Sequence, residues 1–96
     1  FYNTSSPELT ARAASLLSPE PMMSFTTPLR LSDARYGRVK RGYIECAQDN
    51  AIQIMLHRKM QQALPCDPVV TLDTDHSPFF SAPEALCRAL LAMSEA

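Results

Sequence analysis

The sequence predicts an α/β protein, and specifically one part of a larger α/β domain. Residues 39–47 and 69–72 have the composition of strands, and segments with helical periodicity follow them at 52–64 and 81–93. This strand–helix–strand–helix order implies a parallel sheet. Parallel strands need neighbours on both edges and helices on both faces, so two alone make a poor sheet. Since the chain also begins at Phe1 rather than at a methionine, we expect the missing strands on an N-terminal segment.

The composition is typical of a globular protein and excludes several other classes. The 96 residues are 46% hydrophobic and 20% charged with a net charge of −1, which excludes a disordered acidic tail and a disulfide-dense toxin. No apolar run approaches the roughly 18 residues that a membrane span needs. Neither residues 1–48 nor residues 49–96 have the strong basic excess of a nucleic-acid binder. We therefore expect neither a membrane nor a nucleic acid as a partner.

The three cysteines, Cys46, Cys66 and Cys87, are an odd number without a C-x-x-C pair. This spacing supports neither a zinc knuckle nor a redox pair, and the two histidines lie on separate elements without metal-ligand spacing. No metal or other cofactor is therefore expected. Cys46 and Cys87 lie within apolar patterns and are predicted to be small core residues. Such cysteine usage favours a reducing compartment, and we predict the cytoplasm.

The first predicted element is a helix that begins near residue 7. Ser6 provides an N-cap hydroxyl and Pro7 suits the first helical position. Prolines at positions 19 and 21 end the helix. Apolar residues line one predicted helical face, at Leu9, Ala13, Leu16 and Leu17.

Residues 19–38 are predicted to be irregular, since they contain three prolines and no periodic pattern. A stretch of that length without regular structure is uncommon in a compact domain and is often functional. It contains Met22, Met23 and Phe25. Two interpretations are open: these residues belong to a surface that covers something apolar, or they pack locally within a linker.

Two helices are predicted in the second half of the chain. The first, residues 52–64, contains His57, which is predicted to be a surface residue. The last helix is predicted to open with a capping box formed by Ser81 and Glu84. Apolar residues mark one side of the 52–64 helix, at Ile52, Met55, Leu56, Met60 and Leu64.

An aspartate and a histidine follow the two predicted strands. Asp49 comes just after the first strand and His76 just after the second. The carboxyl ends of parallel strands share the edge of the sheet where ligands bind, so the two side chains can meet. A carboxylate that fixes an imidazole tautomer makes the other ring nitrogen a general base. Asp73 and Asp75 compete for the acid role, but Asp75 adjoins His76 and neighbouring side chains diverge.

These positions also have ordinary structural interpretations. An aspartate after a strand is often only a turn residue or a helix cap, and a single loop histidine is more often exposed than catalytic. No nucleophile signature accompanies the pair, because a G-x-S-x-G elbow needs glycines and this chain has only Gly37 and Gly42. The order Asp then His is nevertheless the order that α/β-hydrolases use after their serine.

The chain resembles the C-terminal part of the α/β-hydrolase family that contains the plant methyl esterases and the hydroxynitrile lyases. The similar segments occur in family order over nearly the whole chain. They are FYNTSSPEL (1–9), YGRVKRGYI (36–44), CAQDN (46–50), DH (75–76) and SAPEALC (81–87).

The resemblance implies a serine-type carboxylic ester hydrolase, with Asp49 as the acid of a catalytic triad and His76 as its general base. It implies that residues 1–30 are the end of a helical cap with the following connection, and that residues 31–96 are the C-terminal part of the core. The N-terminal portion, with the nucleophile elbow, would come from outside these 96 residues. The expected partners are that portion and a small-molecule ester, and a homodimer is left open.

A second set of residues is expected to line the substrate pocket, for an acyl or an alcohol group. Ser77 stands where the lyases have a lysine, which argues against cyanohydrin cleavage, and where many esterases of the family have a methionine. Core packing is the competing interpretation, favoured for Phe79 and Phe80. The proposed substrate-binding residues are Met22, Met23, Phe25, Ser77 and Phe79.

Three alternatives to an esterase are left open. The first is a non-catalytic α/β-hydrolase relative that binds a ligand, and the second is a free-standing interaction module that docks through its helices. A hydroxynitrile lyase is the third. The first would lack the serine in its elbow, the second would fold as an isolated monomer, and the third would release cyanide from a cyanohydrin.

Overall fold

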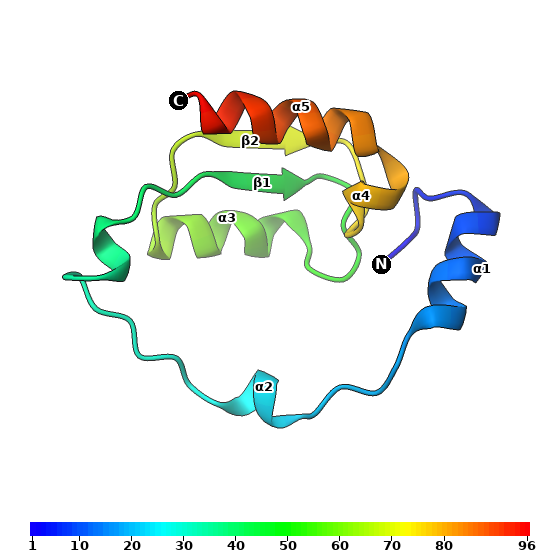
Figure 1. Cartoon of the computed structure of the whole chain (residues 1–96), viewed down its shortest axis with the longest axis horizontal. Helices are drawn as coiled ribbons and strands as arrows, with labels where there is room; N and C mark the ends of the chain where they lie inside the picture. The colour runs from blue at the N-terminus through cyan, green and yellow to red at the C-terminus, as the bar shows by residue number, and fades with distance from the viewer.

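A computed structural model, which describes all 96 residues, has two parallel strands between two helices (Figure 1). Strands β1 (Tyr43–Cys46) and β2 (Val69–Leu72) are joined by helix α3 (Ile54–Ala63). The short helix α4 (Pro78–Ser81) and the longer α5 (Pro83–Ser94) follow β2. In Figure 1, α3 and α5 lie on opposite sides of the strand pair. The predicted strand–helix–strand–helix order and the parallel pairing are confirmed.

Strand β1 is shorter than the predicted strand at residues 39–47. Its ladder runs from Tyr43 opposite Val69 to Cys46 opposite Leu72. The Tyr43 N–H donates to the Pro68 carbonyl at 2.9 Å, but Pro68 has no N–H to donate to the residues that precede β1, and the Arg41 carbonyl accepts from the Asp67 N–H at 2.7 Å instead. Because a proline cannot donate a hydrogen bond to the ladder, the regular pairing begins at the next residue, Val69.

The N-terminal helix α1 (Pro7–Leu16) begins as predicted. The Ser6 hydroxyl oxygen accepts a hydrogen bond from the Leu9 N–H at 3.2 Å, and Pro7 occupies the first turn. Of the predicted apolar face, Ala13 is buried, whereas Leu16 and Leu17 are exposed.

The connection between α1 and β1, residues 17–42, runs in a wide arc away from the strands (Figure 1). It contains only the short helix α2 (Met23–Thr26) and the 3-10 turn η1 (Tyr36–Arg38), so the predicted irregularity is largely correct. Because of this arc, the radius of gyration is 15.3 Å, against about 12.5 Å for a compact chain of this length.

The small core lies between the strands and the helices that contact them, and it corrects two predictions. Cys46 is buried as expected, but Cys87 is exposed on α5. Ser81 ends α4 instead of capping α5, whose N-cap is Ala82. Ser81 lies in the last position of α4, and its hydroxyl is directed toward the Asp75 carboxylate, to which it donates at 3.0 Å. None of the helices combines the length and apolar character needed to cross a membrane.

Helix α3 packs with its polar face toward β1, and its apolar side faces outward. Glu45 on β1 is buried and accepts hydrogen bonds from Arg58 and Gln61 of α3 and from Thr71 of β2. Because the strand presents polar side chains on this face, polar partners on the helix satisfy them. Of the apolar residues predicted to share one side of this helix, Ile52 is half-buried and the others are exposed, at Met55, Leu56, Met60 and Leu64.

Candidate active site

Asp49 lies in the loop after β1, and that loop holds its carboxylate. Oxygen Oδ1 accepts hydrogen bonds from the N–H groups of Ala51 at 2.8 Å and Ile52 at 2.9 Å. This Asx-type turn forms because an aspartate side chain can bond the amides two and three residues further on. The carboxylate is almost fully buried, with 1% of the side chain exposed. Its second oxygen, Oδ2, points away from the loop amides and toward two histidines.

His76 lies in the loop after β2, and its ring contacts Asp49 across the edge of the strand pair. Its Nδ1 is 2.8 Å from Asp49 Oδ2, although the two residues are 27 positions apart. The imidazole is 31% exposed, and no hydrogen bond engages Nε2. The sequence-based prediction that these two side chains meet is confirmed. Their assignment as triad acid and general base remains a prediction.

Hydrogen bonds keep Asp49 ionised. Burial raises the pKa of this carboxyl, but the Ile52 amide, His76, His57 and the Ala51 amide together lower the pKa to about 2 from an ordinary 3.8. Because an ionised carboxylate only accepts hydrogen bonds, the proton of the Asp49–His76 contact belongs to His76 Nδ1. Nε2 of the neutral ring is then free to accept a proton.

A second histidine, His57 on α3, also bonds Asp49, and the prediction that it is a surface residue is wrong. Its Nε2 is 3.0 Å from Asp49 Oδ2, and its side chain is only 8% exposed. Its Nδ1 is 2.8 Å from the Tyr43 hydroxyl on β1. The neighbours of His57, Leu56 and Arg58, do not indicate that it is buried. The signal that could have found it is helical spacing, since His57 and Gln61 lie one turn apart on α3 and both bond side chains of β1.

The positions of the protons in this series of hydrogen-bonded side chains follow from the ionised state of Asp49. His57 Nε2 must donate to the ionised carboxylate, so in the neutral ring Nδ1 accepts the Tyr43 O–H. Burial, the largest cause, raises the pKa of Tyr43 above 10.0, so its hydroxyl keeps its proton near neutral pH. Tyr43, His57, Asp49 and His76 therefore form one continuous hydrogen-bonded series.

The competing aspartates have other partners. Asp75 is fully buried, and its carboxylate accepts from the Thr4 N–H and the Ser5 hydroxyl of the N-terminal segment, at 2.9 and 3.0 Å. It also accepts from the Ser77 N–H and the Ser81 hydroxyl. Burial raises the pKa of Asp75, and these hydrogen bonds lower it overall. Asp75 therefore ties the N-terminal segment to the His76 loop.

Asp73 is exposed, and its carboxylate accepts a hydrogen bond from the Gln48 side chain. The preference for Asp49 over Asp73 and Asp75 as the partner of His76 is therefore confirmed by the contacts.

The five predicted substrate-binding residues are not gathered around His76. Met22, Met23 and Phe25 are each 73% exposed on and beside α2, in the wide arc of Figure 1. Ser77 follows His76 but is buried, and Phe79 on α4 is exposed, so core packing is wrong for Phe79. The aromatic ring that does contact the histidine is Phe1, with its centroid 4.7 Å from that of His76 in an edge-on arrangement.

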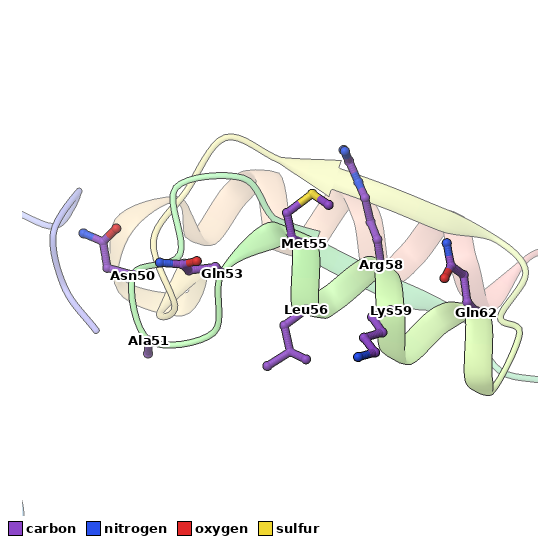
Figure 2. Close-up of a pocket in the computed structure, with 8 residues that line it drawn as sticks. All are labelled: Asn50, Ala51, Gln53, Met55, Leu56, Arg58, Lys59 and Gln62. Carbon is purple, nitrogen blue, oxygen red and sulfur yellow. The ribbon is translucent and has the colours of Figure 1, made fainter.

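The largest surface hollow, about 740 Å³, lies along the outer side of α3 and does not include Asp49 or His76 (Figure 2). No three His, Cys, Asp or Glu side chains converge as metal ligands. The hollow is lined by Asn50, Ala51, Gln53, Met55, Leu56, Arg58, Lys59 and Gln62.

Several known proteins are similar to this chain over almost its full length. Putative methylesterase 11, chloroplastic, of Arabidopsis thaliana is 39% identical over 95 residues, covering 98% of this chain and 24% of the relative. Methyl jasmonate esterase 1 of Vitis vinifera is 35% identical over 102 residues, covering 99% of this chain and 38% of the relative. The chain thus spans between about a quarter and two fifths of the length of these relatives. No family model matches it.

The crystal structure of polyneuridine aldehyde esterase superposes on the chain with a TM-score of 0.89 and 27% identity, over 98% of this chain and 38% of that one. The parallel strands, the flanking helices and the loops at their carboxyl edge are those of the C-terminal part of an α/β-hydrolase. Within that fold class, the chain belongs to the plant methylesterase family.

Proposed function

We propose that this chain is the C-terminal part of a serine-type carboxylic ester hydrolase, in which Asp49 is the triad acid and His76 the general base. The observation that carries the proposal is the 2.8 Å contact between the buried Asp49 carboxylate and Nδ1 of His76. The methylesterase names of the relatives support an ester as the substrate. The nucleophilic serine is proposed to lie on the N-terminal portion of the same hydrolase domain.

In the proposed mechanism, His76 Nε2 takes the proton of the serine hydroxyl as the serine oxygen attacks the ester carbonyl carbon. Asp49 stabilises the imidazolium that forms. The imidazolium then gives the proton to the leaving alcohol, which leaves an acyl-enzyme. Water, deprotonated by the same nitrogen, attacks the acyl carbon and releases the acid and the serine.

We also propose the division of the chain and the residues that line the pocket. Residues 1–30 would be the end of the cap with its connection, and residues 31–96 the core. The exposed apolar side chains of the arc, as they stand, are available to a substrate or to another segment. The proposed pocket residues remain Met22, Met23, Phe25, Ser77 and Phe79.

The cellular compartment and the oligomeric state belong to the same proposal. The free cysteines favour a reducing compartment, for which we propose the cytoplasm. The chloroplast is the alternative, because three of the relatives are named chloroplastic. Fluorescent tagging of the full-length protein distinguishes these compartments, and native mass spectrometry tests the homodimer.

The test of the enzyme proposal is hydrolysis of a small methyl ester by the full-length protein. His76→Ala is expected to lower kcat roughly 10⁴- to 10⁶-fold, as other triad histidines do. Asp49→Asn is expected to lower it by about 10⁴-fold, because the imidazole loses its fixed tautomer. A fluorophosphonate probe should label one serine in the wild type and label it far more slowly in both variants.

The matched control for Asp49→Asn is Asp73→Asn, which removes the same charge from an exposed carboxylate at the same edge of the strands. It should leave kcat unchanged. Undiminished activity of Asp49→Asn would remove Asp49 from the triad. A wild-type protein that neither hydrolyses esters nor reacts with the probe would favour a ligand-binding relative, and cyanide release from a cyanohydrin would favour a lyase.

A further inference from the structure

We infer that His57 is a positioning residue, which holds the Asp49 carboxylate in the orientation that binds His76. The inference rests on the proposed role of Asp49 as triad acid. Asp49 Oδ2 is bonded from two sides, by His76 Nδ1 at 2.8 Å and by His57 Nε2 at 3.0 Å. The usual description of a triad needs only the first of these two contacts.

The two oxygens of Asp49 are held by different parts of the molecule. Oδ1 is held by amides of its own loop, at Ala51 and Ile52. If the loop moved, these bonds would move with it. His57 instead lies on α3, a ten-residue helix that packs on β1. Its bond therefore fixes the carboxylate relative to the strands, and hence relative to the end of β2 from which His76 extends.

Tyr43 fixes His57 in turn. The Tyr43 hydroxyl is 2.8 Å from His57 Nδ1, and the two rings meet edge to face with centroids 5.7 Å apart. A hydroxyl that donates to Nδ1 leaves the proton of the neutral ring on Nε2, where it can reach Asp49. A hydrogen bond to the ring nitrogen that faces away from the functional partner sets both the tautomer and the rotation of an imidazole.

His57 does not itself touch a substrate. Both of its ring nitrogens are engaged, and 8% of its side chain is exposed. His76, in contrast, has one bonded nitrogen and is 31% exposed. The two histidines on one carboxylate oxygen thus have different roles, one as the proposed base and the other as a support for the acid.

The test compares His57→Leu with His57→Gln in the full-length protein, by ester hydrolysis and by NMR of histidine labelled with ¹⁵N. Leucine removes the donor, whereas the glutamine amide can still donate to Asp49 from a similar distance. His57→Leu should lower kcat by about 10-fold or more, the loss typical of outer partners that orient a functional group, with KM little changed. His57→Gln should restore most of the loss, and Lys59→Ala, an exposed neighbour on α3, should have no effect.

The NMR measurement is independent of activity. In the wild type, His57 should be the Nε2–H tautomer and His76 the Nδ1–H tautomer, with a slowly exchanging Nδ1 proton. That proton of His76 should broaden in His57→Leu and return in His57→Gln. Circular dichroism verifies that each variant is folded, and if His57→Leu does not fold, Tyr43→Phe replaces it, with a weaker broadening expected.

The outcomes separate this inference from the proposed function. An unprotonated Nε2 on His57, or an unchanged His76 proton and an unchanged kcat in His57→Leu, would overturn the positioning role. A wild-type protein without esterase activity that nevertheless shows the expected tautomers and their loss in His57→Leu would overturn the proposed function. The structural part of this inference, the support of Asp49 by His57, would then stand.

Discussion

The two loops at the carboxyl ends of β1 and β2 differ sharply from the connection at residues 17–42. The loops bury polar groups, and the carboxylates of Asp49 and Asp75 are bonded by several donors each. The connection, in contrast, exposes apolar side chains, with Met22, Met23 and Phe25 each 73% exposed. Burying a charge is costly unless hydrogen bonds satisfy it, and a satisfied network of such bonds fixes the geometry of the segments that it joins.

The comparison predicts that substitutions in the loops reduce stability and that substitutions in the connection do not. The largest effect is expected at Asp75. Asp75→Ala leaves four donors without their acceptor and should lower the free energy of unfolding by about 3 kcal/mol. It should also loosen the N-terminal segment, because the Thr4 N–H and the Ser5 hydroxyl lose their acceptor, although the backbone N–H of residue 75 still donates to the Thr4 hydroxyl. Urea denaturation measures the first effect, and hydrogen exchange at the Thr4 amide the second.

Asp73→Ala is the control for Asp75→Ala, because it removes the same charge from the same loop at an exposed position. It should change the free energy of unfolding by less than about 0.5 kcal/mol. Equal losses in the two variants would show that loop charge, and not the hydrogen bonds of Asp75, stabilises this region.

A second, smaller effect is expected from acid. The pKa of Asp49 is about 2 in the folded protein against an ordinary 3.8. The folded value is the lower one, so the stability that Asp49 contributes is complete above the unfolded value and is lost as the pH falls through the folded value. The expected contribution is about 2 kcal/mol.

The measurement is the difference in unfolding free energy between the wild type and Asp49→Asn as a function of pH. It should decrease by about 2 kcal/mol as the pH falls from about 5 to about 2. Taking the difference cancels the pH-dependent contributions of the other carboxylates, Glu45 and Asp75, whose pKa values are also lowered. A difference that does not change with pH would contradict the lowered pKa of Asp49.

The smallest effect on stability is expected in the connection. Replacing Met22, Met23 and Phe25 together by serine should change the free energy of unfolding by less than about 0.5 kcal/mol, since exposed side chains contribute little. If these residues line the substrate pocket as proposed, KM for the ester should rise while kcat stays the same. A clear loss of stability would mean that they pack against another segment, and an unchanged KM would remove them from the pocket.

Much of the architecture could be predicted from the sequence because it depends on local patterns. Alternating strand and helix segments predicted parallel strands, and parallel strands place their carboxyl ends at one edge. That reasoning was enough to bring Asp49 and His76 together, which the 2.8 Å contact confirms. The start of α1 was also readable, because the Ser6 cap is a bond between neighbours in the chain.

Other features depended on which surfaces meet, and local patterns do not contain that information. The Ser81–Glu84 pattern fits a capping box, yet Ser81 bonds Asp75, a partner that only the folded loop brings within 3.0 Å. Cys87 fits a core position on α5 but lies on its exposed side.

The sequence by itself determined the order of the elements and the edge of the sheet at which the aspartate and the histidine lie. Only the tertiary structure decided which face of α3 packs on β1. The helix has an apolar side, but Tyr43 and Glu45 of β1 present polar groups to it, and polar side chains of the helix satisfy them. That choice of face brought His57 to Asp49, because hydrogen-bond satisfaction of buried groups is a property of two packed surfaces.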